Sequence, residues 1–213
     1  MAHGSMPFLG DSAVRHMAAV LERFENELYP ELAKRLSDMP VVPDGARQST
    51  LNINSLHGGQ AECHDGLPAP CVADSCRMVI DRRFLIEESL ADVRGEVTDI
   101  LESLAETRPD FRFDIRELFA VEPSIADRDG PVASITAAAI EDVLGVQPAI
   151  VCSPGTYDQK HVDRIGKLKD CIAYGPGLLD LAHQPDEWIG IEDMTAAAKV
   201  MATAASRLLR KEA

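Results

Sequence analysis

The chain has 213 residues, of which 46% are hydrophobic and 26% charged, and its formal net charge is −14. This length and composition are typical of a globular protein with one large or two small domains. The negative charge repels phosphate backbones and anionic lipid, and no apolar run reaches the roughly 18 residues that span a bilayer. We therefore expect binding to neither nucleic acid nor membranes.

The first predicted elements are a helix and two strands. Asp11 can cap a helix that starts at Ser12, because apolar residues then recur every three or four positions. From Ser49 the apolar period changes to two, which predicts a strand with Leu51, Ile53 and Ser55 on one face. Residues 77–84 predict the second strand.

A second helix and a third strand follow. Glu87-Glu88-Ser89 opens a helix that runs through Leu104 and ends at Pro109. Residues 111–121 then alternate apolar and polar side chains, the clearest strand pattern in the chain. One more strand ahead of the first helix would complete a ferredoxin-like βαββαβ sandwich, with two helices on one face of an antiparallel sheet. Since that strand would have to precede His3, we expect residues 1–121 to be such a domain with its first strand truncated.

The second half, residues 122–213, predicts an α/β layer. A linker (123–131) leads to an alanine-rich helix over 132–144. Short buried strands are expected at 149–152 and 171–174, with a helical turn or two between them at 158–165. The last helix runs from about residue 191 to 211, with Met194, Ala198, Met201, Ala205 and Leu208 on one face.

His183 is the first candidate for chemistry. It lies between glycine-rich turns and Pro185, where a rigid loop would present its side chain. One interpretation is a histidine held by a structural hydrogen bond. The other is a zinc ligand, with Asp186 or Glu187 as the carboxylate that orients the ring.

Two further stretches could contact a substrate. The loop at 153–158 follows a predicted strand, and Gly155 would let the backbone approach an anionic group, although an ordinary turn explains it equally well. Of Arg82 and Arg83, one could bind a substrate carboxylate through two hydrogen bonds while the other pairs with Asp81. A solvated ion pair is the simpler interpretation.

The five cysteines are an odd number, and no basic segment followed by an apolar core marks an export signal. We therefore expect reduced thiols in a cytoplasmic protein. The alternatives are a disulfide and a zinc knuckle built from Cys63, His64, Cys71 and Cys76.

Four runs, taken in order, resemble the aminoacylase, acetylornithine deacetylase and succinyl-diaminopimelate desuccinylase family of di-zinc metallopeptidases and amidohydrolases. They are His3-Gly4-Ser5-Met6-Pro7-Phe8-Leu9-Gly10, Asp81-Arg82-Arg83, Gly155-Thr156-Tyr157-Asp158 and Ala182-His183-Gln184-Pro185-Asp186-Glu187. The resemblance implies that residues 1–121 are the lid or dimerisation domain of a homodimer. It also implies that residues 122–213 are the C-terminal return into the zinc-binding catalytic domain.

The resemblance also implies roles for single residues. His183 matches the last metal ligand, and His3 matches the lid histidine that stabilises the oxyanion in the partner subunit's active site. Arg83 matches the arginine that holds the substrate carboxylate, and Gly155 with Thr156 matches the substrate-binding loop. The implied reaction is attack of metal-activated water on an amide carbonyl, with a glutamate as general base.

The sequence departs from the family pattern in its metal ligands. The first ligand motif (His-x-Asp), the bridging aspartate, the Glu-Glu pair with the general base and a further acidic ligand precede the lid in the family, and this sequence has no match for them. The lid-loop asparagine also has no match near Cys71. A single imidazole cannot hold a catalytic zinc, which needs about three protein ligands.

We therefore expect the C-terminal portion of a metal-dependent hydrolase that cleaves an amide of an N-acyl amino acid or small peptide with a free carboxylate, inactive as this chain alone. One alternative is a non-catalytic dimerisation or binding module. Another is a stand-alone metalloenzyme that uses His183, His161, Asp186 and Glu187.

Overall fold

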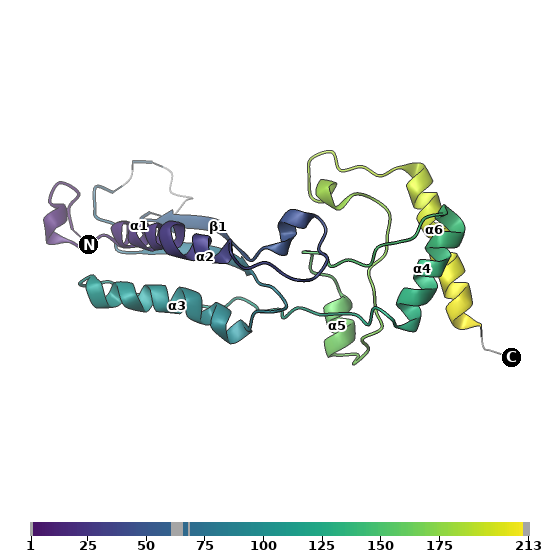
Figure 1. Ribbon diagram of the computed structural model, residues 1–213. Coiled ribbons are helices and arrows are strands. Elements are labelled where there is room, and N and C mark those ends of the chain that lie inside the picture. Colours follow the sequence, from purple (N-terminus) through teal and green to yellow (C-terminus); the bar gives the residue numbers. More distant parts are fainter. Residues whose placement is uncertain (1, 61–65, 68, 211–213) are drawn as a thin grey trace. The chain divides into compact units, whose positions relative to one another are not determined.

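The computed structural model describes residues 2–60, 66–67 and 69–210 and divides them into two compact units (Figure 1). Unit 1 comprises the residues up to 38 together with 48–120, and unit 2 comprises 39–47 and 121–213. The sequence places the loop at 39–47 in the first domain. It belongs instead to unit 2, because Val41 forms a parallel bridge with Cys152 there. Both units mix helices with extended chain, in agreement with the expected α/β class.

The first helix of unit 1 is almost continuous. It consists of α1 (Ala13–Arg23), a wider π-helical turn (Phe24–Leu28) and α2 (Tyr29–Leu32). Ser12, rather than Asp11, is the N-cap, because its hydroxyl accepts a hydrogen bond from the backbone N–H of Arg15. Pro30 does not end the helix: the π-helical turn stands directly before α2, and α2 continues to Leu32.

The sheet of unit 1 has two antiparallel strands, β1 (Thr50–Gly58) and β2 (Cys76–Arg83), close to the predicted ranges. Ile53 pairs with Ile80 and Ser55 with Val79, so the register shifts around Asn54. This bulge interrupts the alternation of faces. Ser55, predicted on the buried face with Leu51, is therefore exposed.

The strand predicted at 111–121 is wrong, because this part of the described chain has no regular secondary structure. Phe111 is 9% exposed and belongs to the core, but Phe113, Leu118 and Phe119 are 39%, 61% and 80% exposed. Alternating apolar and polar side chains show that a segment fits a half-buried pleated surface. It forms a strand only when a neighbouring strand completes the hydrogen bonds, and the described sheet contains β1 and β2 alone.

Helix α3 (Leu90–Thr107) closes the core of unit 1. Ser89 caps it, because its hydroxyl accepts a 3.1 Å hydrogen bond from the N–H of Asp92. The core joins the two helical segments to the inner face of the sheet. Its buried members are Val20, Phe24, Leu28, Leu32, Leu51, Ile100, Leu104 and Phe111.

Unit 2 is built on α4 (Pro131–Leu144) packed against α6 (Ile191–Leu209), with the short α5 (Gln159–Arg164) elsewhere in the unit. Gly145 adopts φ 70°, the left-handed conformation that ends α4. Helix α6 does not pack through the face that carries its methionines. Ala197, Val200 and Ala204 are buried, because small side chains let the two helices approach closely, whereas Met194 and Met201 are 47% and 48% exposed.

The strands predicted at 149–152 and 171–174 are also not formed in the described chain, apart from the single bridge between Cys152 and Val41. Short 3-10 turns lie at Pro7–Leu9, Asp44–Arg47 and Leu179–Leu181. Within the described residues, no helix combines the length and apolarity needed to cross a membrane.

Candidate functional site

The N-terminal segment holds His3 against the loop that precedes β2. The N–H of Gly4 donates to the carbonyl of Pro70 at 2.6 Å, the N–H of Val72 donates to the carbonyl of Ala2 at 2.8 Å, and His3 forms an antiparallel bridge with Cys71. The backbone of His3 is therefore fixed by hydrogen bonds on both sides.

The imidazole of His3 is exposed, and its Nδ1 is engaged locally. The backbone N–H of Ser5 donates to Nδ1 at 3.2 Å, and the Ser5 hydroxyl lies 2.7 Å from the same atom. Because Nδ1 accepts a hydrogen bond from a backbone donor, a neutral ring carries its proton on Nε2. The arrangement presents an N–H donor, the group that stabilises a developing oxyanion.

Arg83 is the last residue of β2 and lies opposite Thr50. Its Nε and Nη2 donate to Oδ2 of Asp81 at 3.0 and 2.8 Å, and its side chain is 57% exposed. Arg83 and Asp81 therefore form an ion pair. This agrees with the simpler interpretation of the sequence, a solvated ion pair. The ion pair holds the guanidinium at the surface.

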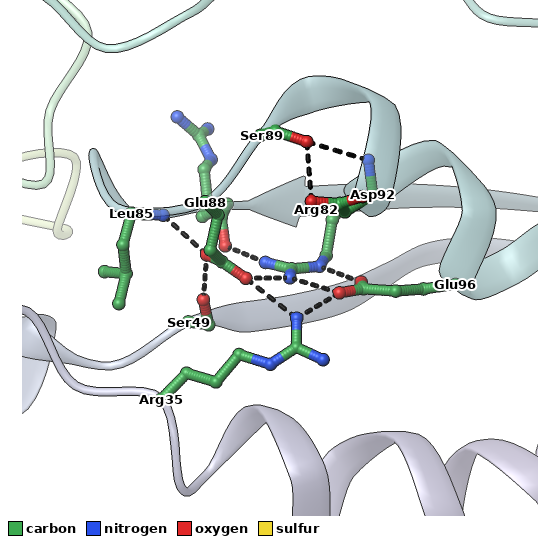
Figure 2. Close-up of polar contacts among 9 residues, drawn as sticks. Arg35, Ser49, Arg82, Leu85, Glu88, Ser89, Asp92 and Glu96 are labelled. Atoms are coloured by element: carbon green, nitrogen blue, oxygen red, sulfur yellow. Dashed lines mark hydrogen bonds and ion pairs between the residues drawn. The ribbon is translucent and has the colours of Figure 1, made fainter.

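Arg82 has the opposite environment and is the centre of a charge network that the sequence reading missed (Figure 2). Its side chain is 7% exposed. Nη2 donates to Glu88 at 2.7 Å, and Nε donates to Glu96 at 3.0 Å. Arg35 joins the same two carboxylates, with its Nη1 2.9 Å from Oε1 of Glu88.

A signal for this network was present in the sequence. Side chains two apart on a strand share a face, so Arg82 lies on the same side as Met78 and Ile80, which pack on the core. A charge on that side needs buried partners. The sequence could not name them, because Arg35 and Glu96 are distant along the chain.

Glu88 collects most of the donors in the network. Its carboxylate accepts hydrogen bonds from the hydroxyl of Ser49, from the N–H of Leu85 at 2.6 Å, and from Arg35 and Arg82. Burial alone would raise the pKa of Glu88, but these hydrogen bonds lower it to about 2. Glu88 is thus ionised at neutral pH, and the two arginines balance the charges of Glu88 and Glu96.

The neighbouring Glu87 binds the chain where it leaves unit 1. Its Oε1 accepts a 2.9 Å hydrogen bond from the hydroxyl of Ser37 and a 3.1 Å hydrogen bond from the N–H of Asp38. Glu88 binds Ser49, where the chain returns. Two adjacent carboxylates therefore hold both ends of the 39–47 loop.

The 153–158 loop of unit 2 is folded on itself. The hydroxyl of Ser153 lies 3.0 Å from that of Tyr157 and accepts a 3.2 Å hydrogen bond from the N–H of Gly155. A Cβ at Gly155 would lie 3.3 Å from both side-chain oxygens, a tight contact that the glycine avoids. Gly155 and Thr156 are exposed.

His183 is exposed and adopts φ 63°, in the left-handed region. Its backbone N–H donates to Oε2 of Glu187 at 3.1 Å. No group of three or more His, Cys, Asp or Glu side chains that could hold a metal occurs in the part of the chain that is described. Because a catalytic zinc takes about three protein ligands, these donors do not fit the ion by themselves. The stand-alone site of His183, His161, Asp186 and Glu187 is not formed there.

The alternative zinc knuckle involves Cys63 and His64, which lie outside the described residues, so it stays a prediction. Cys71 and Cys76 are free thiols. Burial raises the pKa of Cys76, which keeps that sulfur protonated and weakens it as a ligand at neutral pH.

Comparison with known proteins adds the following likenesses. A model described as the peptidase dimerisation domain matches residues 1–109. An acetylornithine deacetylase of Pectobacterium carotovorum subsp. carotovorum (strain PC1) is 30% identical over 142 residues, which cover 66% of this chain and 32% of that protein. One from Salmonella arizonae is 28% identical with the same coverage.

Among solved structures, an M20 family metallo-carboxypeptidase from Sulfolobus solfataricus matches with a TM-score of 0.66 at 16% identity. The match covers 95% of this chain and 54% of that one, so the likeness is one of fold. The chain spans about a third of the length of the curated relatives that it matches.

Proposed function

This chain belongs to the M20 family of peptidases, and we propose that it is part of a hydrolase that cleaves the amide of an N-acyl amino acid or a small peptide with a free carboxylate. Residues 1–121 would be the lid or dimerisation domain, and residues 122–213 would belong to the catalytic domain. The relatives named acetylornithine deacetylase support an N-acyl amino acid as the substrate class.

The observation that carries this proposal is the placement of His3. Its backbone is bridged to Cys71 and its Nδ1 is engaged by Ser5, so the ring presents Nε2–H outward. We assign to it a hydrogen bond to the oxyanion that forms in the partner subunit's site.

Two further positions would bind the substrate. Arg83, with its exposed guanidinium, would hold the substrate carboxylate. The backbone at Gly155 and Thr156 would contact the rest of the substrate.

His183 would supply one metal ligand. M20 metallopeptidases are metal-dependent, generally through zinc, which polarises the scissile carbonyl and activates water when bound. Since the described donors do not fit the ion by themselves, hydrolysis would need ligands beyond those that His183 and its neighbours offer.

Amine release from N-acetylornithine tests the proposal. The purified chain with two equivalents of zinc should release no amine. In a zinc titration, His183→Ala should bind zinc as the unchanged chain does, because one imidazole contributes little affinity; His161→Ala is the matched control. Turnover by the chain alone, together with loss of zinc in His183→Ala, would contradict the expectation that this chain is inactive by itself.

The second candidate is a non-catalytic dimerisation or binding module, favoured by the match of residues 1–109 to a dimerisation domain. That match suggests a homodimer formed through residues 1–121 in either case. Light scattering at micromolar concentration should give twice the 23.1 kDa chain mass. A strict monomer would count against both candidates.

We also place the protein in the cytoplasm. The described cysteines Cys71, Cys76 and Cys171 are free thiols, which suits a reducing compartment. Alkylation of the protein taken directly from cells, followed by mass spectrometry, should find them unpaired.

A further inference from the structure

We propose that Glu88 is a positioning residue for Arg83: through Arg82, it fixes the end of β2 from which Arg83 reaches a substrate carboxylate. This inference rests on the proposed function, because it takes Arg83 as the carboxylate-binding arginine. It assigns a role to the network of Arg82, Glu88 and Glu96. This network supports the backbone of Arg83 and does not itself contact the ligand.

Arg82 connects the carboxylates to the main chain of Arg83. Its Nη1 donates to the carbonyl oxygen of Arg83 at 2.5 Å, while its Nη2 and Nε donate to Glu88 and Glu96 (Figure 2). A guanidinium is planar and carries its donors in a rigid fork. Fixing one side of Arg82 on two carboxylates therefore fixes the donor that holds the Arg83 carbonyl.

Glu88 also holds the turn that follows Arg83. Its Oε2 accepts a 2.6 Å hydrogen bond from the N–H of Leu85, and its own N–H donates to the carbonyl of Leu85 at 3.1 Å. On the other side, Arg83 is paired with Thr50 in the sheet. The backbone around Arg83 is thus restrained by the sheet before it and by Glu88 after it.

Such restraint matters for a carboxylate ligand. Two parallel hydrogen bonds from a guanidinium to a carboxylate require a defined orientation, which a flexible strand end would have to acquire on binding. Asp81 orients the Arg83 side chain, and the network orients its backbone. Arg82 is not itself a candidate for the ligand, because it is 7% exposed and already binds two carboxylates.

The test uses the full chain, labelled with nitrogen-15, and two small probes. N-acetylglycine carries the carboxylate, and N-acetylglycinamide is the same molecule without the charge. The Arg83 Nε–H signal is assigned by its loss in Arg83→Gln, and dissociation constants come from shift changes on titration. The variants are Glu88→Gln, Arg82→Lys, Arg83→Gln and, as matched control, Glu117→Gln, which alters an exposed glutamate paired with Arg94.

We expect Glu88→Gln and Arg82→Lys to bind N-acetylglycine about three- to tenfold more weakly, the cost of ordering about one side chain and its strand end on binding. Affinity for the amide should stay unchanged, and Glu117→Gln should match the unchanged chain. Arg82→Lys keeps the positive charge and one ion pair. A loss of affinity in this variant would therefore come from the changed position of Arg83 and not from a missing charge.

Three results would overturn the inference. If Arg83→Gln loses carboxylate affinity while Glu88→Gln and Arg82→Lys keep it, Arg83 binds the ligand without help from the network, and the proposed function stands. If both network variants lose affinity for the amide as much as for the carboxylate, the network is merely structural. If Arg83→Gln binds the carboxylate as the unchanged chain does, the proposed role of Arg83 fails, and this inference with it.

Discussion

Arg82 and Arg83 are adjacent in the sequence, yet the side chain of Arg82 is 7% exposed and that of Arg83 is 57% exposed. Successive side chains of a strand point to opposite faces, so β2 turns one arginine towards Glu88 and Glu96 and the other towards solvent. A register shift of one residue would exchange the two, leaving Arg83 among the carboxylates.

The pH dependence of stability should report the network. The pKa of Glu88 is about 2 in the folded chain, below its ordinary value of 4.5, so its stabilising effect is present above pH 4.5 and is lost as the pH falls towards 2. The lowered pKa corresponds to about 3 kcal/mol at pH 7. Urea unfolding of the chain and of Glu88→Gln should therefore differ at pH 7 and converge near pH 2. Parallel curves across this range would contradict the prediction.

Phe24 should be a major contributor to the stability of unit 1. It is 0% exposed, at the start of the π-helical turn, and it packs in the core. Phe24→Ala should lower the free energy of unfolding by about 3–5 kcal/mol, because it removes apolar contact and leaves a cavity. Phe8→Ala is the matched control, since Phe8 is 79% exposed. Equal effects in denaturant melts would show that the core is assigned to the wrong residues.

The face of α6 that packs on α4 can be tested with two adjacent alanines. Ala204 is 6% exposed and lies in the core of unit 2, whereas Ala205 is exposed. Ala204→Leu should destabilise the chain by about 1–3 kcal/mol through overpacking. Ala205→Leu should have little effect in the same thermal or denaturant melts. If Ala205→Leu destabilised the chain more than Ala204→Leu, the helix would pack through the face that carries the methionines.

The chain should self-associate through residues 111–121. Leu118 and Phe119 are 61% and 80% exposed, and the segment has no strand neighbour among the described residues. Exposed apolar side chains on extended backbone favour association. Sedimentation velocity should show less association for Phe119→Ser, while Ile165→Ser, which alters a residue 78% exposed in unit 2, should leave it unchanged. Equal reduction by both would point to non-specific association.

The helices could be predicted because their signals are local. The periodic apolar residues, the cap at Ser89 and the glycine after Leu144 all lie within or beside the helix that they define. In α6 the sequence shows a face with two methionines, but the face that packs carries Ala197, Val200 and Ala204. Close approach of two helices depends on the partner helix, which periodicity does not reveal.

The strands at 111–121, 149–152 and 171–174 were mispredicted for a different reason. Alternation or apolarity shows that a segment suits a sheet, but hydrogen bonds to a second strand decide whether one forms. The network at Arg82 was missed for the same reason, since Arg35 and Glu96 are far from it in the sequence. Local patterns singled out Arg83, His183 and the loop with Gly155 and Thr156, whereas His3 and all the assigned roles came from family resemblance. These roles stay predictions.

The loop at 39–47 has a consequence for how unit 1 could be produced separately. Leu36 and Gln48 form an antiparallel bridge, and Glu87 and Glu88 bind Ser37 and Ser49 on either side of the loop. The two ends of the loop are therefore neighbours inside unit 1. A gene in which residue 38 is joined to residue 48 through one or two glycines would encode unit 1 as an uninterrupted polypeptide, since a tight turn of about two to four residues can connect paired antiparallel segments.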